Sequence, residues 1–394
     1  MKIAIIDADL VVNIRTHRFP NLACMKLSGY YKSKNHDVNL LTSYNEEDLI
    51  IYDKIFISKV FTETNVPEWL LKDERVLYGG TGFFYDKAPP LPSEIEHHMP
   101  DYNLYSEWVQ ERLANGDSRK SMEYYLDYSI GFTTRGCMRG CSFCVNKNSK
   151  SSVMHSPVDE FFDSNRKYIC LLDDNVLACK DWKSIFESLI KTNRKFQYKQ
   201  GMDERLLTNE KCDYIFNKSK WQGDYIFAFD NIADKDIIIK KLKLIRSVTN
   251  KKNIKFYVFT GFNHNNIGQY DEEFYKQDIE DLLARIKILS EYKCYPYVMR
   301  YIDVYSAPYP YKGVYNGIAG WCNQPQFYTS MTCREFCIAK GMKDNLWKEF
   351  VNKPSEYKFN KRMSWRSMED FLKDNPSLKH FYDFKGSVVR KSVK

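Results

Sequence analysis

The stretch from Tyr128 to Cys144, YSIGFTTRGCMRGCSFC, decides how this 394-residue chain is interpreted. It opens with a short apolar run that is typical of a buried strand, and it continues directly into a loop with three cysteines. Cys137, Cys141 and Cys144 are separated by three and then two residues, so one loop can turn all three thiols toward one metal centre. Cysteine thiolate is the usual ligand of iron-sulfur clusters. The stretch therefore predicts a metal centre at the carboxyl end of a strand.

The number of cysteines predicts the kind of metal centre. Three thiolates leave one iron of a four-iron cubane open. An open coordination position makes a metal site reactive, by the logic that separates catalytic from structural zinc. A structural zinc knuckle is the alternative, but it needs a fourth Cys or His nearby, and the nearest one, His155, lies eleven residues beyond Cys144. Gly136 and Gly140 would let the loop wrap closely around an inorganic core.

The arrangement C-x3-C-x2-C, with the aromatic Phe143 before the last cysteine, resembles the signature of the radical S-adenosylmethionine (SAM) superfamily. The resemblance implies that Cys137, Cys141 and Cys144 hold a 4Fe-4S cluster and that SAM chelates the open iron, with Phe143 near its adenine. One electron would then cleave SAM to methionine and a 5'-deoxyadenosyl radical, which abstracts hydrogen from a substrate. The resemblance also implies a reductant protein of the flavodoxin or ferredoxin type. It leaves the substrate open among small molecules, peptides and RNA.

Alternating short apolar runs and helical stretches predict an α/β fold on both sides of the cysteine loop. The candidate strands are Lys2–Asp7, Asp37–Thr42, Lys54–Ser58, Arg75–Tyr78, Tyr128–Thr133, Tyr168–Leu172, Phe196–Gln200, Tyr225–Phe229, Lys255–Phe259 and Tyr295–Arg300. We interpret 1–110 as a flavodoxin-like (Rossmann-like) domain and 111–305 as a partial (β/α)6 barrel, related to a TIM barrel, of the kind that the resemblance implies. Residues 306–394 would form a C-terminal extension. Four prolines within 87–101 predict an extended linker there.

Charged side chains follow several of the later strands, where the chemistry of a parallel barrel takes place. Asp173 and Asp174 could accept hydrogen bonds from the amino group of SAM. Asp203, Arg205 and Asp230 are candidates for the SAM carboxylate, the ribose hydroxyls or the substrate. The structural alternative for each is helix capping by aspartate and surface pairing by arginine.

The N-terminal segment is similar to the cobalamin-binding domain of one branch of the superfamily, and the turn Gly79–Gly82 resembles the glycine-rich turn found there. The histidine-bearing ligand motif of many cobalamin modules is absent from this chain. Three interpretations remain open: cobalamin bound without a histidine, a vestigial domain that shapes the substrate pocket, or a docking site for a partner. The first would make the protein a cobalamin-dependent radical SAM methyltransferase.

The last part of the chain suggests a different class of function. Residues 345–394 hold twelve basic and six acidic side chains, and the whole chain has a formal charge of +8. Lys358, Lys361, Arg362 and Arg366, beside Tyr357, Phe359 and Trp365, could contact nucleic-acid phosphates, as in a non-catalytic metal-cluster protein that binds nucleic acid. A solvated face is the plainer interpretation.

The remaining cysteines bear on a second cluster and on the compartment. Cys294, Cys322, Cys333 and Cys337 could hold an auxiliary cluster or simply pack in the core. Eleven cysteines without a secretory signal favour a reducing compartment, the cytoplasm. No stretch is long and apolar enough to predict a membrane span.

Overall fold

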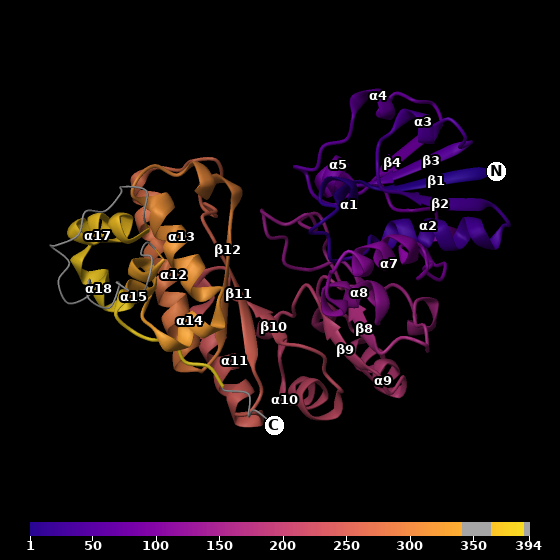
Figure 1. The fold of residues 1–394 in the computed structure, drawn as a ribbon. Coiled ribbons are helices and arrows are strands. Elements are labelled where there is room, and N and C mark those ends of the chain that lie inside the picture. The colour runs from indigo at the N-terminus through magenta and orange to yellow at the C-terminus, as the bar shows by residue number, and fades with distance from the viewer. Residues whose placement is uncertain (341–363, 390–394) are drawn as a thin grey trace. The chain divides into compact units, whose positions relative to one another are not determined.

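The computed structural model describes residues 1–340 and 364–389 (Figure 1). The chain is a mixed α/β protein with parallel sheets, which confirms the predicted α/β class. It divides into two compact units, Met1–Gln200 and Gly201–Lys394. This division falls inside the predicted barrel segment, and the predicted boundaries at 110 and 305 stay predictions.

The N-terminal sheet has four parallel strands in the order β2-β1-β3-β4. They are β1 (Lys2–Asp7), β2 (Asp37–Leu41), β3 (Lys54–Ser58) and β4 (Val76–Gly79). Alternate residues of a strand point to opposite faces of its sheet. Ile3 and Ile5 accordingly enter one hydrophobic core, whereas Ala4 and Ile6 enter another on the opposite face. Burial on both faces is typical of a parallel sheet covered by helices on each side.

Helices cover both faces of this sheet (Figure 1). The helices of the chain before β5 (Tyr128–Gly131) are α1 (Ala8–Val12), α2 (Leu22–Ser33), α3 (Glu46–Leu49), α4 (Glu68–Leu71), α5 (Thr81–Phe84), α6 (Ser93–Glu96), α7 (Ser106–Ala114) and α8 (Glu123–Leu126). The prediction of an extended linker over 87–101 was wrong, because Ile95 of α6 is buried in the same core as Ile3. Trp108 of α7 belongs to that core too, so the chain stays packed on the sheet well beyond the prolines.

The first unit also holds a second parallel sheet, in the order β5-β8-β9. Its strands are β5 (Tyr128–Gly131), β8 (Tyr168–Leu171) and β9 (Lys195–Tyr198), with α9 (Trp182–Lys191) between the last two. Between β5 and β8 the chain forms a small antiparallel hairpin of β6 (Thr134–Arg135) and β7 (Val153–Met154). The predicted strand positions are thus correct to within a few residues.

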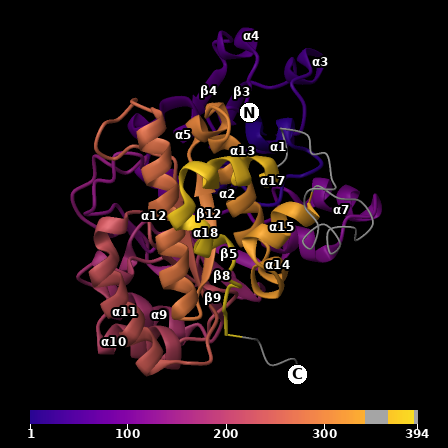
Figure 2. The same ribbon diagram turned by 90° about the vertical axis from the view of Figure 1, so that its left-hand side faces the viewer.

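The second unit holds three parallel strands, β10 (Tyr225–Ala228), β11 (Ile254–Thr260) and β12 (Tyr295–Arg300). Its helices are α10 (Asn209–Asp213), α11 (Lys235–Val248), α12 (Glu272–Glu291), α13 (Tyr311–Cys322), α14 (Pro325–Ser330), α15 (Cys333–Ala339), α17 (Ser364–Asp374) and α18 (Lys379–Tyr382), with a π-helical turn at Tyr214–Lys218. Figure 2 looks onto this helical layer, in which α17 packs against α13. The six strands of the predicted barrel therefore exist and are hydrogen-bonded in two sheets of three.

Helix α12 shows how the second unit buries its apolar surface. Its 20 residues present a buried stripe that includes Ile279, Leu282 and Ile286, and charged side chains cover its other face. This pattern is that of an amphipathic helix on a core. Among the described residues, no helix is both long and apolar enough to cross a membrane.

Candidate functional site

The three cysteines of the predicted metal centre lie on the loop between β6 and β7, which we call the cysteine loop (136–152). Pairing of Thr134 with Met154 and of Arg135 with Val153 brings the two ends of the loop together. The loop follows the carboxyl end of β5, as predicted. Its position matches the edge at which parallel strand-helix proteins carry their chemistry.

The thiols of the cysteine loop differ from the other cysteines in exposure. Cys137, Cys141 and Cys144 are partly exposed, whereas the remaining eight are buried. Backbone and side-chain N–H groups point at two of the sulfurs: Asn175 Nδ2 donates to Cys137 Sγ and the Asn146 amide donates to Cys144 Sγ, each at 3.4 Å. Hydrogen bonds to sulfur are one of the means by which proteins tune iron-sulfur clusters. The loop thus offers accessible thiols with donors already in place.

Two glycines allow the backbone of the cysteine loop to turn. Gly136 has φ +88° and Gly140 has φ +60°, in the region that L-residues with a Cβ rarely adopt. A Cβ at Gly136 would lie 2.4 Å from the Ser151 carbonyl oxygen and 2.5 Å from Ser149 Oγ. The close approach that Gly136 permits is therefore to the returning arm of the same loop. Ser149 Oγ in turn accepts a hydrogen bond from the Cys137 amide at 3.1 Å.

The Asp173 carboxylate binds the residues that lead from β5 into the cysteine loop. Its carboxylate is fully buried and accepts hydrogen bonds from the amide and the hydroxyl of Thr133 and from the amide and the hydroxyl of Thr134, at 2.5 to 3.0 Å. Burial raises its pKa to about 6, against the lowering effect of these hydrogen bonds. The predicted contact of Asp173 with SAM stays a prediction, and the structure gives this carboxylate a role in fixing the loop.

Asp174 is the second carboxylate beneath the loop. One oxygen accepts from the Gly136 amide at 2.8 Å and the other accepts from Asn146 Nδ2 at 2.6 Å. Asp174 thereby ties the residue before Cys137 to the second residue after Cys144. Its predicted contact with the SAM amino group is likewise untested by this geometry.

The Asp173→Asn variant should lose about 1 to 3 kcal/mol of unfolding free energy, the range expected when a buried donor is left unsatisfied. An asparagine amide would place N–H groups against the Thr133 amide, which donates to Asp173 Oδ2. The measurement is urea unfolding of the apoprotein, with the exposed Asp159→Asn as the matched control. Equal midpoints for the two variants would contradict this role of Asp173.

The donor set of the loop fits an iron-sulfur cluster. Thiolates are the ligands such clusters require, and Cys137, Cys141 and Cys144 are the accessible ones. Within residues 1–340 and 364–389, no group of three or more His, Cys, Asp or Glu side chains is arranged to hold a single metal ion. In a four-iron cluster each of the three cysteines would bind a different iron, so the thiols would not have to meet at one ion.

The candidate residues of the second unit already have partners within the chain. Asp203 accepts from Arg205 Nε at 2.8 Å, and Arg205 also donates to Asp234 at 2.7 Å. Asp230 is partly exposed, accepts a hydrogen bond from the Phe259 amide at 3.0 Å, and interacts electrostatically with Arg285 and Arg205. Asp203 also caps the short helix that begins at Glu204. The capping and pairing that the sequence left as an alternative are thus present, and the predicted contacts with SAM or substrate stay predictions.

The sequence did not point to two buried ionisable residues beside these candidates. Glu204 is 1% exposed, and burial followed by the charge of Asp203 raises its pKa to about 8, so the carboxyl group is protonated at neutral pH. Arg285, in the middle of α12, is 2% exposed and donates to the carbonyl oxygens of Phe229, Asp230 and Phe259. Neither stands in a motif, and no sequence signal separates them from surface charges.

The cysteines considered for an auxiliary cluster are buried in the second unit. Cys333 and Cys337 are neighbours on α15, and Cys322 lies near them. Cys294 lies against Arg246, whose Nη2 is 3.3 Å from its sulfur. The described part of the chain shows no metal-binding group here. Their surroundings are those of packed core residues.

Part of the basic C-terminal segment lies outside the described residues, namely Tyr357, Lys358, Phe359, Lys361 and Arg362. Of the two described members, Trp365 is 4% exposed, and the Arg334 guanidinium lies over its ring. Arg366 pairs with Asp370 four residues later on α17. The Trp365 ring is therefore packed in the core and not open to a base, and the nucleic-acid alternative for this segment stays a prediction.

The carboxyl edge of the N-terminal sheet is where a flavodoxin-like domain would bind a ligand, between β1 and β3. Asp7 and Ser58 are partners in register at this point. Tyr105 donates to Asp7 Oδ2 at 2.8 Å, and Asn21 Nδ2 donates to Ser58 Oγ at 2.9 Å. All four side chains are buried. This side of the crevice is therefore filled by the chain itself.

The glycine turn after β4 is filled in the same way. Gly80 has φ +105°, and a Cβ there would lie 2.3 Å from the Lys59 carbonyl oxygen. At Gly82 a Cβ would lie 2.7 Å from the Phe61 carbonyl oxygen. The glycines thus accommodate the segment after β3, which the Asp9 carboxylate also binds through the Val60 amide at 2.7 Å. These residues do not fit a corrin, and we derive no step through cobalamin.

Asp7 should make the stability of the N-terminal sheet depend on pH. Burial raises its pKa from 3.8 to about 7, although the Tyr105 hydrogen bond lowers it. The contribution of the protonated Asp7 carboxyl to the free energy of unfolding is therefore complete below pH 3.8. It is lost as pH rises through about 7, because the folded state must then bury a charge. The free energy of unfolding of Asp7→Asn, relative to that of the native chain, should therefore be higher at pH 8 than at pH 5 by roughly 2 kcal/mol. Urea unfolding at both pH values tests this, with the exposed Asp48→Asn as control; a constant difference would contradict it.

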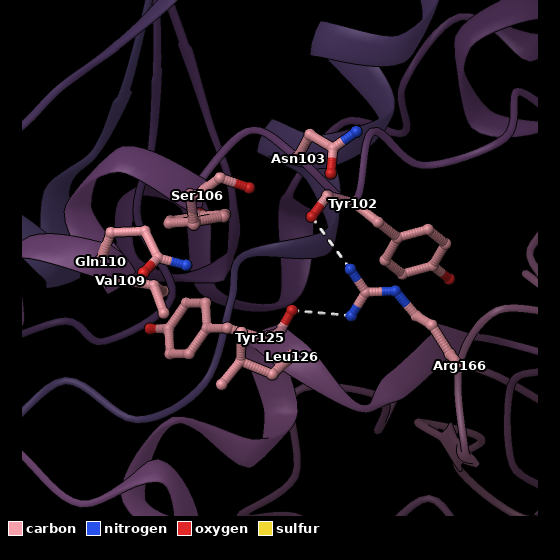
Figure 3. Close-up of a pocket in the computed structure, with 9 residues that line it drawn as sticks. Tyr102, Asn103, Ser106, Val109, Gln110, Tyr125, Leu126 and Arg166 are labelled. Carbon is pink, nitrogen blue, oxygen red and sulfur yellow. Dashed lines mark hydrogen bonds between the residues drawn. The ribbon is translucent and has the colours of Figure 1, made fainter. Parts of the chain in front are cut away.

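A cavity of about 220 Å³ lies beside α7 and α8 (Figure 3). Arg166 lines it, donating through Nη1 to the Tyr125 carbonyl at 2.7 Å and through Nη2 to the Tyr102 carbonyl at 3.0 Å. The Arg166 guanidinium also lies over the Tyr102 ring, so its contacts are those of a structural residue. Tyr125 precedes β5 whereas the cysteine loop follows it, so this cavity lies at the other end of that strand.

The chain was compared with models of known protein families. No family model matches. The functional interpretation therefore rests on the cysteine loop and its surroundings.

Proposed function

We propose that this protein is a radical SAM enzyme, with Cys137, Cys141 and Cys144 as ligands of a 4Fe-4S cluster. The observation that carries the proposal is the cysteine loop: three partly exposed thiols at the carboxyl end of β5, with N–H donors directed at two of the sulfurs. When bound, the cluster supplies the electron that cleaves SAM to methionine and a 5'-deoxyadenosyl radical. The substrate class stays open among small molecules, peptides and RNA.

The chain's own residues would position the reactants. Asn175 and the Asn146 amide would donate hydrogen bonds to the cluster-bound sulfurs of Cys137 and Cys144. Asp173 and Asp174 fix both arms of the loop. Phe143, which is partly exposed between two of the ligands, would lie against the adenine. These side chains orient the bound groups, whose chemistry belongs to the cofactors.

Two features of the strands support the finer fold assignment that accompanies this function. The order 2-1-3-4 of the N-terminal sheet is the one with which flavodoxin-like sheets begin. The order of β5, β8 and β9, and of β10, β11 and β12, follows the chain, as in a parallel barrel of strand-helix units. We propose a flavodoxin-like domain, a partial (β/α)6 barrel and a C-terminal extension on this basis.

The proposed partners follow from the reaction. A one-electron donor such as a flavodoxin or ferredoxin would reduce the cluster. The eleven cysteines all lie within residues 1–340, and none of them forms a disulfide there. Reduced thiols are the rule in a reducing compartment, so we place the proposed activity in the cytoplasm.

The test is anaerobic reconstitution of the full chain with iron and sulfide, followed by incubation with SAM and dithionite. We expect about four irons per chain, the broad visible absorption of an iron-sulfur cluster, and 5'-deoxyadenosine as a product. Omitting dithionite is the control, because cleavage requires an electron. A colourless protein that binds stoichiometric zinc, or an iron protein that yields no 5'-deoxyadenosine, would refute the proposal.

A further inference from the structure

Two segments of the N-terminal domain contact the cysteine loop or the β6-β7 hairpin that carries it, and neither contact belongs to a motif in the sequence. The first is the turn Tyr85–Lys87, which directly follows α5 at the carboxyl edge of the four-stranded sheet (Figure 1). The second is α6. The turn, α6 and the cysteine loop all lie in the first unit.

The turn after α5 holds the outer part of the loop. Tyr85 donates its hydroxyl to the Phe143 carbonyl oxygen at 2.8 Å. Asp86 accepts from Asn148 Nδ2 at 3.0 Å and pairs with Lys147 Nζ at 3.2 Å. The same Lys147 ammonium lies 5.3 Å from the centre of the Tyr85 ring. The contacts thus bracket Cys144, with Phe143 on one side and Lys147 and Asn148 on the other.

Helix α6 holds the base of the loop. The Glu96 carboxylate, 13% exposed, receives Arg135 Nη2 at 3.2 Å and His155 Nε2 at 2.9 Å. Arg135 belongs to β6 and His155 follows β7, so one carboxylate joins the two ends of the hairpin. The Lys26 ammonium of α2 lies 3.0 Å from the same carboxylate, and this ion pair joins α6 to α2. Burial opposes ionisation of Glu96, but the His155 hydrogen bond and the Lys26 charge together lower its pKa to about 2.

The backbone at Tyr85 is strained in a way that serves this contact. Tyr85 has φ +48° and ψ −114°, a combination that a bulky L-residue seldom adopts. Strain of this kind persists where the surrounding structure over-determines it, and it is found most often at functional sites. Tyr85 comes three residues after Gly82, and the segment Gly80–Gly82 before it is closely packed.

We propose that the N-terminal domain is a clamp that positions the cysteine loop, with Tyr85, Asp86 and Glu96 as positioning residues, and that it holds no corrin. The crevice that a cofactor would occupy is filled by Asn21 and Tyr105, while the edge of the same sheet grips the loop at its base and beside Cys144. The consequence for SAM rests on the proposed function; the clamp itself rests on these contacts. Because Tyr85 holds the carbonyl of Phe143, the clamp sets where this ring meets the adenine.

Hydrogen exchange of the apoprotein tests the clamp without any cofactor. In Tyr85→Phe and in Asp86→Ala, amides of 141–148 should exchange roughly threefold to tenfold faster, the factor expected for one lost hydrogen bond. Amides of β1 and β3 should be unchanged. Tyr78→Phe, at an exposed tyrosine of the neighbouring β4, is the matched control. Unchanged exchange in both variants would overturn the clamp, whatever the protein's reaction.

The reconstituted protein provides a second readout. Tyr85→Phe should keep its iron content and its kcat for 5'-deoxyadenosine formation, while its KM for SAM rises roughly threefold to tenfold. A role in folding alone would lower the amount of active protein and leave KM unchanged. Glu96→Gln leaves Lys26 buried without its partner and is the more severe variant, so Tyr85→Phe decides the outcome if Glu96→Gln fails to fold.

Cobalamin binding completes the test. The native chain, mixed with hydroxocobalamin and desalted, should retain no corrin absorption. Stoichiometric retention would overturn the inference that the domain holds no corrin. Absence of iron and of 5'-deoxyadenosine, with faster exchange in Tyr85→Phe, would leave the clamp standing and refute the radical SAM function.

Discussion

Cys141→Ala should abolish the proposed cleavage of SAM. Cys141 is the middle ligand of the proposed cluster, and its carbonyl oxygen accepts from the Cys144 amide at 2.9 Å, so the two residues form one turn. Without its thiolate, a second iron of the cubane would be exposed to solvent. We expect iron content near zero and 5'-deoxyadenosine formation lowered by more than about 100-fold, beyond what loss of a supporting residue costs a metal site.

Cys212→Ala is the matched control for Cys141→Ala. Cys212 is a buried cysteine of α10 in the second unit, so this variant removes a thiol without touching the cysteine loop. It should retain its iron and its activity. Iron content that stays at the native value in Cys141→Ala, or falls equally in both variants, would contradict the assignment of Cys141.

Most of the strand positions could be predicted from the sequence because they depend on local composition. Lys2–Asp7 and Lys54–Ser58 are runs of β-branched and apolar residues bounded by polar ones, and the structure places strands over those same residues. The position of the cysteine loop could be predicted for a similar reason, since its three cysteines are close together in the sequence. Such features need no knowledge of distant segments.

Helix α13 could not be predicted locally, because glycine is a poor helix former and this helix contains three. Tertiary packing explains them. A Cβ at Gly313 would lie 1.9 Å from Ser367 Oγ, and one at Gly317 would lie 2.8 Å from Cys337 Sγ. The glycines let α17 and α15 approach α13 closely, and this approach depends on residues far along the chain.

The partners of the candidate site residues were hidden for the same reason. Asp173 was predicted to face SAM because it follows a strand, yet its four hydrogen-bond donors come from Thr133 and Thr134, some forty residues earlier in the chain. Pairing of β5 with β8 brings these residues together. A carboxylate at a strand end can thus serve the loop of the neighbouring strand, and spacing alone does not distinguish that role from ligand binding.

Arg285→Met should be the most destabilising substitution in the second unit. The guanidinium is 2% exposed and donates through Nη1 to the carbonyl oxygens of Phe229, Asp230 and Phe259, at the carboxyl ends of β10 and β11. It also neutralises Asp278 and Asp230, the two carboxylates with which it interacts most strongly. Methionine would fill much of the space but would supply no donor and no charge.

We expect Arg285→Met to lose about 3 to 5 kcal/mol of unfolding free energy, the cost of removing one partner from a buried charged network. Urea unfolding is the measurement, and Lys276→Met, on the exposed face of the same helix, is the control. Asp278 gives the prediction a second arm: its Oδ2 accepts from the Thr260 hydroxyl, the Gly261 amide and the Tyr315 hydroxyl. If Arg285 chiefly balances this carboxylate, Asp278→Asn should recover part of the loss in the double variant. A loss below about 1 kcal/mol in Arg285→Met would show that the strand ends are held in another way.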